Sequence, residues 1–243
     1  MMELIEEIVR DAEYPVSIQD ALGLTGMDAE ELIICANRVR KAHRGNRGSL
    51  CSIVNAKSGS CSQDCAFCSQ SARHRTVIDK YPLLPVESIV ERALRMEEAG
   101  AANYSIVTSG VSLSDGEIEQ VCEATRTIRE RTRLRVCGSL GLLTADKALR
   151  LKQGGLQRYH HNLETARSHY PRICTTRSYD DNIATIRLAA AAGLSACSGG
   201  IFGMGEGWEE RADLALELRE LPCDTIPVNF LNPIAGTRLE NTP

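Results

Sequence analysis

The stretch Leu50-Cys-Ser-Ile-Val-Asn55, followed closely by Cys61-Ser-Gln-Asp-Cys65-Ala-Phe67-Cys68, decides the fold prediction for this chain. The first segment has the apolar character of a short buried strand. The second places three cysteines in a C-x3-C-x2-C spacing on the loop that follows. Because α/β barrels build their active sites on the loops after their strands, we expect these three thiols to lie at a functional site.

The same arrangement of a helix followed by a short buried strand recurs along the rest of the chain. Alternating strands and helices predict a parallel sheet with crossover helices, here an α/β fold of the TIM-barrel type with about six βα units. Residues 1–45 predict an N-terminal helical segment and residues 46–243 the barrel. A full barrel needs two more units, so we expect the last strands to be missing. The predicted strands are 50–55, 104–108, 134–138, 157–162, 194–198 and 225–230, and the helices between them are 85–99, 115–131, 144–153, 179–192 and 209–221.

Composition narrows the class of protein. The formal net charge is -4 and no basic block occurs, which argues against a nucleic-acid partner. No apolar run approaches the length of a membrane helix, and the N-terminus lacks the profile of a signal peptide, so a cytoplasmic protein is expected. Ten cysteines in such a chain indicate metal or redox chemistry more than a disulfide framework.

The spacing of the three cysteines suits an iron–sulfur cluster. Cys61, Cys65 and Cys68 can hold three irons of a [4Fe–4S] cubane, which leaves the fourth iron open to chelate a substrate. The alternative is a closed structural zinc site with His74 as the fourth ligand. The position of the loop, directly after the first strand of a barrel, favours iron–sulfur chemistry.

Five blocks of sequence, taken in order, carry a resemblance. The loop around Cys61–Cys68 resembles the radical S-adenosylmethionine (SAM) superfamily, and residues 30–240 as a whole resemble the biotin synthase family. The blocks are Cys61–Arg73, Tyr159–Thr165, Cys174–Tyr179, Cys197–Glu206 and Ile226–Leu231.

The resemblance implies a reaction and its partners. Family members insert sulfur into dethiobiotin to form biotin, and they use a [4Fe–4S] cluster, SAM and an auxiliary iron–sulfur cluster that donates the sulfur. It also implies a low-potential electron donor of the flavodoxin or ferredoxin type, and a homodimer. Two alternatives are a related radical SAM maturase acting on another small molecule, and a non-catalytic iron–sulfur or zinc-binding fragment.

The resemblance also implies roles for residues that contact SAM. Phe67 and Ile201 match positions that pack on the adenine, although both would equally suit a plain apolar core. Asn162 and Glu164 follow a strand, where the carboxylate is expected to bind the ribose hydroxyls. Arg177 is a candidate partner for the methionyl carboxylate, because a guanidinium pairs with a carboxylate in bidentate fashion; the alternative is a solvated charge at a helix start.

Other polar residues at strand ends receive different predictions. Asn229 matches a residue near the ureido ring of dethiobiotin, with a turn-capping role as the alternative. His160 and His161 are expected to be satisfied strand-end residues and not ligands.

The auxiliary cluster departs from the best-known family pattern of three cysteines and one arginine. Cys137 and Cys197 match two of the cysteines, while Ser105 stands at the third, and the family's arginine lies beyond the end of this chain. Cys51 lies in the first strand, on the face of its odd-numbered residues. Together with the stretch His160-His-Asn-Leu-Glu164, this resembles the branch of the family from anaerobes, which uses a larger auxiliary iron–sulfur cluster. We therefore predict that Cys51, Cys137 and Cys197 hold a [2Fe–2S] or larger cluster. The alternative is that these are buried apolar thiols. Cys174 is a further possible ligand.

Overall fold

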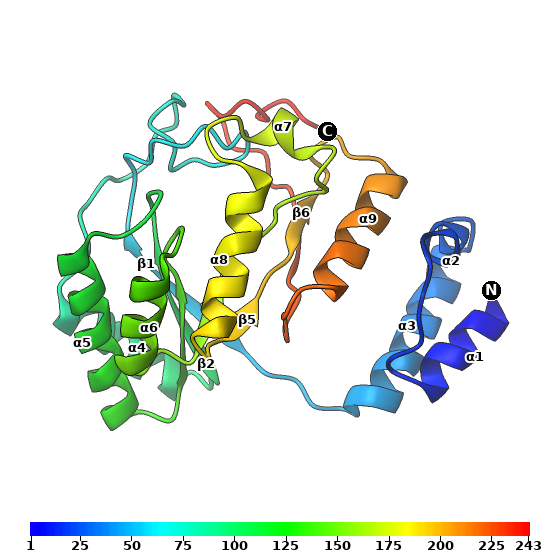
Figure 1. The fold of residues 1–243 in the computed structure, drawn as a ribbon, viewed down its shortest axis with the longest axis horizontal. Coiled ribbons are helices and arrows are strands. Elements are labelled where there is room, and N and C mark those ends of the chain that lie inside the picture. Colours follow the sequence, from blue (N-terminus) through cyan, green and yellow to red (C-terminus); the bar gives the residue numbers. More distant parts are fainter.

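The structure is a computed structural model that describes all 243 residues, and its centre is a parallel sheet covered on its outer face by helices (Figure 1). The sheet has the strand order β1-β2-β3-β4-β5, with every neighbouring pair parallel. Two more strands, β6 and β7, form a second parallel pair. The strands are β1 Cys51–Lys57, β2 Asn103–Thr108, β3 Arg135–Ser139, β4 Arg158–His160, β5 Ser195–Cys197, β6 Gly200–Phe202 and β7 Val228–Phe230.

The fifth predicted strand, 194–198, corresponds to β5, whereas β6 is a further strand that was not predicted; Ser198 and Gly199 separate the two. A side chain is excluded at Gly199, where a Cβ atom would lie 1.9 Å from the carbonyl oxygen of Pro227. Cys197 forms a bridge with Thr225, which joins the two sheets across this break. All six predicted strands are therefore present, and β6 is a seventh.

The helices of the barrel start where the sequence provides a cap. Ser114, Thr144 and Ser178 each accept a hydrogen bond from a backbone N–H in the first turn of α5, α6 and α8. The prediction of these helices is confirmed to within one or two residues at each end. The helices are α4 Val86–Glu98, α5 Asp115–Arg131, α6 Ala145–Gln153, the short α7 Tyr170–Ile173, α8 Tyr179–Ala191 and α9 Trp208–Arg219.

The strands separate an apolar outer face from an inner face that carries chemistry. On β1, Val54 and Ala56 are buried in the main core beneath the helices, whereas Cys51 and Ile53 are exposed on the other face. The predicted alternation of β1 is therefore confirmed. Because β1 pairs only with β2 and β7 only with β6, the barrel is partial, as expected.

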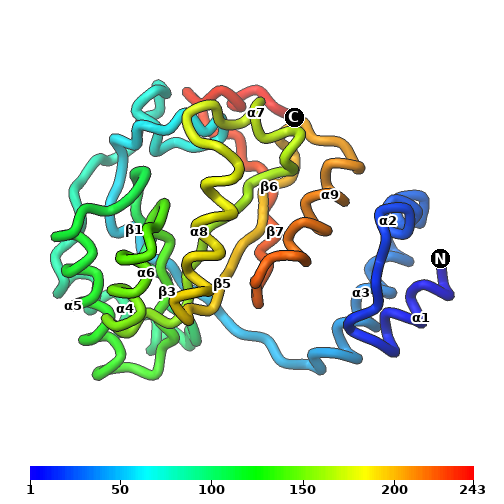
Figure 2. Tube along the Cα trace, viewed as in Figure 1, coloured from blue at the N-terminus to red at the C-terminus, as the bar shows by residue number.

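Three helices precede the sheet: α1 Met2–Arg10, α2 Ile18–Leu24 and α3 Ala29–Arg44. They lie to one side, next to α9 and away from β1–β5 (Figures 1 and 2). Arg219 of α9 donates a hydrogen bond of 2.7 Å to the carbonyl of Val16. The division of the chain at residue 45 stays a prediction. None of the helices has the length and apolarity needed to cross a membrane.

Candidate functional site

Two adjoining cavities open on the inner face of the sheet. The first, here called the cluster cavity, has a volume of about 350 Å³ and lies at the loops that follow the strands. The second, the lumen cavity, has a volume of about 780 Å³. Both are lined by the same seven residues where they meet: Ile53, Phe67, Val107, Ser139, His160, Asn162 and Glu164.

Cys61, Cys65 and Cys68 all line the cluster cavity. Backbone hydrogen bonds hold their loop: Cys68 N–H donates to the carbonyl of Cys65 at 3.0 Å, and Ala66 N–H donates to that of Ile173 at 2.8 Å. No group of three His, Cys, Asp or Glu side chains is arranged to hold a single metal ion. Three thiols around one cavity provide the donor set of an iron–sulfur cluster, whose sulfur ligands stand farther apart than those of one ion. The residues present therefore fit such a cluster.

Asp64 fixes this loop to the segment after α7. Its carboxylate accepts hydrogen bonds from the backbone N–H and hydroxyl of both Thr175 and Thr176. Although burial opposes it, this set of donors lowers the pKa of Asp64 well below its ordinary value. The loop is thus held from outside by a permanently ionised carboxylate.

Arg177 brings a positive charge to the cluster cavity. Its side chain lines that cavity, and its Nε donates a hydrogen bond of 3.2 Å to the hydroxyl of Tyr170. Arg177 takes part in no salt bridge, so its guanidinium is available to a ligand carboxylate. The structure places the predicted Arg177 within the same cavity as the three cysteines.

Asn162 and Glu164 stand at the junction of the two cavities. Asn162 Nδ2 donates to Glu164 Oε2 at 3.2 Å, while its Oδ1 accepts from the N–H of Gly199 at 3.1 Å. Glu164 has a φ of 73°, a left-handed conformation that is rare for a residue with a side chain. Burial raises the pKa of Glu164 to about 7, and the Arg177 charge offsets only part of that effect. Such a carboxyl needs hydrogen-bond donors from a ligand to become fully ionised.

The two predicted adenine contacts come together. Phe67 and Ile201 both line the lumen cavity and pack against the same small apolar cluster, which contains Ala66, Ile173 and Met204. They are half-buried. An apolar surface is therefore available beside the cysteine loop.

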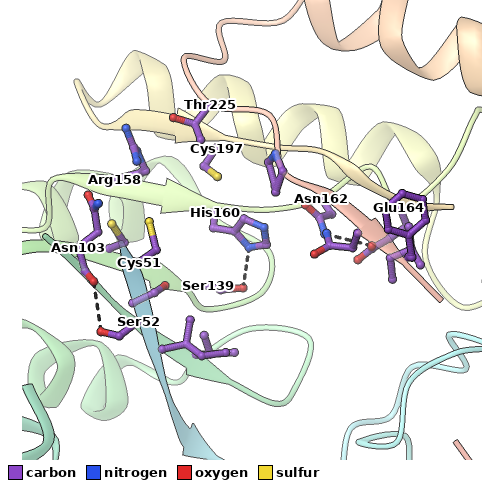
Figure 3. A pocket seen from close by; sticks show the side chains of 18 of the residues that line it. Cys51, Ser52, Asn103, Ser139, Arg158, His160, Asn162, Glu164, Cys197 and Thr225 are labelled. Atoms are coloured by element: carbon purple, nitrogen blue, oxygen red, sulfur yellow. Dashed lines mark hydrogen bonds between the residues drawn. The ribbon is translucent and has the colours of Figure 1, made fainter. Parts of the chain in front are cut away.

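Cys51, Cys137 and Cys197 line the lumen cavity, and Ser105 joins them. Figure 3 shows Cys51 and Cys197 in this cavity. Strand register brings these cysteines together. Cys137 of β3 pairs with Ser105 of β2, while Cys51 of β1 and Cys197 of β5 lie next to the row of residues that contains this pair, on either side of it. Alternate residues of a strand point to one face, so the three thiols share the inner face. Burial raises the pKa of Cys137 to about 11 and of Cys197 to about 12. These thiols therefore stay neutral unless a positive charge or a metal stabilises the thiolates.

Sequence reasoning missed Arg158, which lies among these cysteines (Figure 3). Arg158 pairs with Cys137 in the register of β3 and β4, and its charge opposes the rise in the pKa of Cys137. Its Nε donates to Ser195 Oγ at 3.1 Å and its Nη2 lies 3.4 Å from Asp224 Oδ1. No short motif contains this arginine, so only strand register could have found it.

His160 was assigned to a passive role, yet it lines both cavities. Its Nδ1 lies 3.2 Å from Ser139 Oγ, and burial lowers the pKa of its imidazole, which is therefore neutral at pH 7. His161 Nε2 lies 3.0 Å from Asn182 Oδ1, and its buried side chain also lines the cluster cavity. Asn229 also lines the lumen cavity and donates to the carbonyl of Gly200 at 3.2 Å.

Cys174 is not near the auxiliary set, and its prediction as a further auxiliary ligand is wrong. It is buried beside Cys65, whose thiol pKa is raised by a hydrogen bond with Cys174 and by burial. The segment after α7 is tied to the cysteine loop through Asp64, which carries Cys174 to the first site instead of the second. Cys35 and Cys122 are buried in helices α3 and α5.

A partial barrel with three cysteines on the loop after its first strand defines a radical SAM protein, and residues 57–218 match the radical SAM superfamily. The biotin synthase of Syntrophus aciditrophicus is 51% identical over 97% of this chain and 74% of its own length. That of Pelotomaculum thermopropionicum is 46% identical over 99% of this chain and 75% of its own. The chain belongs to the biotin synthase family.

The fold itself has a close counterpart among solved structures. Methylornithine synthase superposes with a TM-score of 0.85 at 22% sequence identity, covering 98% of this chain and 70% of that one. At this identity the match speaks for the fold alone. Family membership decides against the structural zinc site that the cysteine spacing left open.

Proposed function

We propose that the chain is a radical SAM sulfurtransferase that inserts sulfur into dethiobiotin to form biotin. The observation that supports this most is the presence of two cysteine sets on adjoining cavities of one barrel. The first set is Cys61, Cys65 and Cys68, and the second is Cys51, Cys137 and Cys197.

When bound, the two clusters and SAM supply the electron, the hydrogen-abstracting 5′-deoxyadenosyl radical and the sulfur that this insertion requires. The role of the chain is to hold these groups and the substrate in one line. Cys61, Cys65 and Cys68 hold the first cluster at the mouth of the barrel. Three protein ligands would leave one iron of that cluster free to bind SAM, and Arg177 lines the same cavity as the three cysteines.

Different residues around the first cysteine set bind the carboxylate, the ribose and the adenine of SAM. Arg177 pairs with the methionyl carboxylate through charge-assisted hydrogen bonds. Glu164 accepts hydrogen bonds from the ribose hydroxyls, and Asn162 holds its carboxylate in place at 3.2 Å. Phe67 and Ile201 offer the apolar surface on which the adenine packs.

Dethiobiotin fits between the two cysteine sets, in the lumen cavity. A ureido ring needs both donors and acceptors, which Asn229 of β7 and the neutral His160 of β4 provide. A cavity of about 780 Å³ is large enough for a small molecule of this kind. Enclosure by the barrel keeps water away from reactive carbon centres.

Cys51, Cys137 and Cys197 hold the auxiliary cluster at the base of that cavity. The guanidinium of Arg158 offsets the negative charge of their thiolates, and Asp224 and Ser195 keep it in place. Arg158 thereby supplies, from β4, a positive charge next to the cluster.

The proposal also includes a low-potential electron donor, assembly as a homodimer and a cytoplasmic location. The family likeness supports all three, and the reaction, which consumes electrons, supports the first as well.

The experiment is a single anaerobic incubation of the iron- and sulfide-reconstituted chain with SAM, dethiobiotin and dithionite. We expect 5′-deoxyadenosine and methionine in equal amounts, with biotin formed only when dethiobiotin is present. The same incubation with Cys65→Ala serves as control and should yield none of the three. If the wild-type chain makes no 5′-deoxyadenosine, the proposal is wrong.

A further inference from the structure

The outer side of the cysteine loop carries four arginines without carboxylate partners. Arg73, Arg75, Arg172 and Arg238 are all exposed. None of them takes part in a salt bridge. Other exposed arginines, such as Arg126 and Arg187, also lack salt bridges, so what distinguishes these four is their place around the cysteine loop. We call these four residues the arginine face.

Two of these side chains are attached to the cysteine loop itself. Arg73 Nε donates a hydrogen bond of 2.9 Å to the carbonyl of Ser62. Arg238 Nη2 donates to the carbonyls of Asp64 at 2.9 Å and Ile173 at 2.8 Å. Ser62 and Asp64 lie between Cys61 and Cys65 in the sequence. The charges of Arg73 and Arg238 therefore lie on the loop that holds the first cluster.

The other two arginines belong to segments joined to the same loop. Arg172 precedes Ile173, whose carbonyl accepts from the N–H of Ala66 at 2.8 Å. Arg75 N–H donates to the carbonyl of Gly236 at 3.1 Å, and Gly236 lies two residues before Arg238. The four charges therefore surround one short stretch of backbone.

The carboxylates of these segments do not neutralise the arginine face. Asp64 is turned toward the hydroxyls and N–H groups of Thr175 and Thr176. Glu240 accepts a hydrogen bond of 2.6 Å from the N–H of Gly236. A local positive excess thus exists in a chain whose formal net charge is -4. Such a patch attracts an acidic partner and raises its rate of association.

We propose that the arginine face is the docking surface for a small acidic ferredoxin that reduces the first cluster. The proposal rests on the function given above, because only a reductively cleaved substrate needs an electron at this loop. One electron leaves the reduced ferredoxin, which is thereby oxidised, and reduces the cluster held by the three cysteines. Iron–sulfur proteins reach strongly negative reduction potentials, and electron-transfer encounters use small, electrostatically guided interfaces. Docking over the loop makes the path between the two clusters short.

The test separates docking from catalysis by using two electron sources. Arg75 and Arg172 are suitable targets because no side-chain hydrogen bond involves either one, so the double variant Arg75→Glu/Arg172→Glu should keep the loop intact. The matched control is Arg126→Glu, which changes an exposed arginine on α5. Helix α5 lies at the lower left of Figure 1, whereas the cysteine loop lies toward the top. Formation of 5′-deoxyadenosine is measured with reduced ferredoxin and with dithionite, and ferredoxin binding is measured separately by calorimetry.

In the double variant we expect the ferredoxin-driven rate to fall about tenfold or more and binding to weaken equally, with the dithionite-driven rate unchanged. The control variant should match the wild type in all three measurements. Rising salt should weaken ferredoxin binding to the wild type far more than to the double variant.

Three results would overturn the proposal. The first is equal ferredoxin binding by the wild type and the double variant, and the second is a parallel loss of the dithionite-driven rate. The third is that an acidic flavodoxin depends on these arginines while ferredoxin does not. If no donor yields 5′-deoxyadenosine from the wild type, the proposed function fails. The binding measurement still decides whether the arginine face docks ferredoxin.

Discussion

The two cysteine sets of this barrel are built in opposite ways. Cys61, Cys65 and Cys68 come from eight consecutive residues on one loop, whereas Cys51, Cys137 and Cys197 come from three strands spread over most of the chain. The first set is fixed by local backbone hydrogen bonds and the second by strand register. A local set can assemble as soon as its loop is ordered, while the second exists only when the sheet is complete. The two sets should therefore be separable by mutation.

The largest effect is expected from loss of a ligand in the first set. Cys65→Ala should lower the iron content by about four atoms per chain and reduce 5′-deoxyadenosine formation by roughly a thousandfold or more, because the reducing cluster is gone. Iron and acid-labile sulfide are measured after anaerobic reconstitution. Cys35→Ala, which alters a buried cysteine of α3, is the control and should change neither quantity. Full iron retention in Cys65→Ala would mean that this loop does not hold the cluster.

Loss of a ligand in the second set should separate the two halves of the reaction. Cys51→Ala is expected to abolish biotin formation, a fall of about a hundredfold or more, and to leave cleavage of SAM within about twofold of wild type. Both products are measured by mass spectrometry in one reaction. Cys122→Ala, a buried cysteine of α5, provides the control. An unchanged biotin yield in Cys51→Ala would remove Cys51 from the ligand set.

A smaller effect is expected at Arg177, which binds and does not react. Arg177→Gln removes a charge-assisted pair worth about 1.5–3 kcal/mol, so the Kd for SAM should rise about tenfold to a hundredfold. Equilibrium binding to the reconstituted chain gives the value. Arg187→Gln, on the exposed side of α8, the helix that follows Arg177, should bind as the wild type does. Equal affinities for the two variants would contradict a contact between Arg177 and the ligand.

The smallest effect concerns Glu164 and pH in the ligand-free chain. Burial raises its pKa from the ordinary 4.5 to about 7, so folding favours the protonated carboxyl. The stability from this group is fully present below about pH 4.5 and is lost as the pH rises through about 7. The melting temperature of the wild type should therefore fall by a few degrees between pH 5 and pH 8, relative to Glu164→Gln. Parallel pH profiles of the two proteins would show that Glu164 titrates normally.

The contrast between the two sets also shows what sequence can predict. The cysteine loop, the six strands and the capped helices were predictable because each depends on neighbouring residues. Arg158 and His160 were not, since what brings them to the cavities is the pairing of β4 with β3 and β5. Cys174 was assigned to the wrong set because its position depends on Asp64, which lies 110 residues earlier in the chain.

Whether the two sets are independent is tested most directly in a chain with Cys51, Cys137 and Cys197 all replaced by Ala. Iron and sulfide are counted after reconstitution, and the electron paramagnetic resonance spectrum is recorded with and without SAM. We predict one [4Fe–4S] cluster per chain, with a signal that SAM perturbs. A variant that keeps the full wild-type iron content, or one that loses all its iron, would contradict the presence of two separate cluster sites.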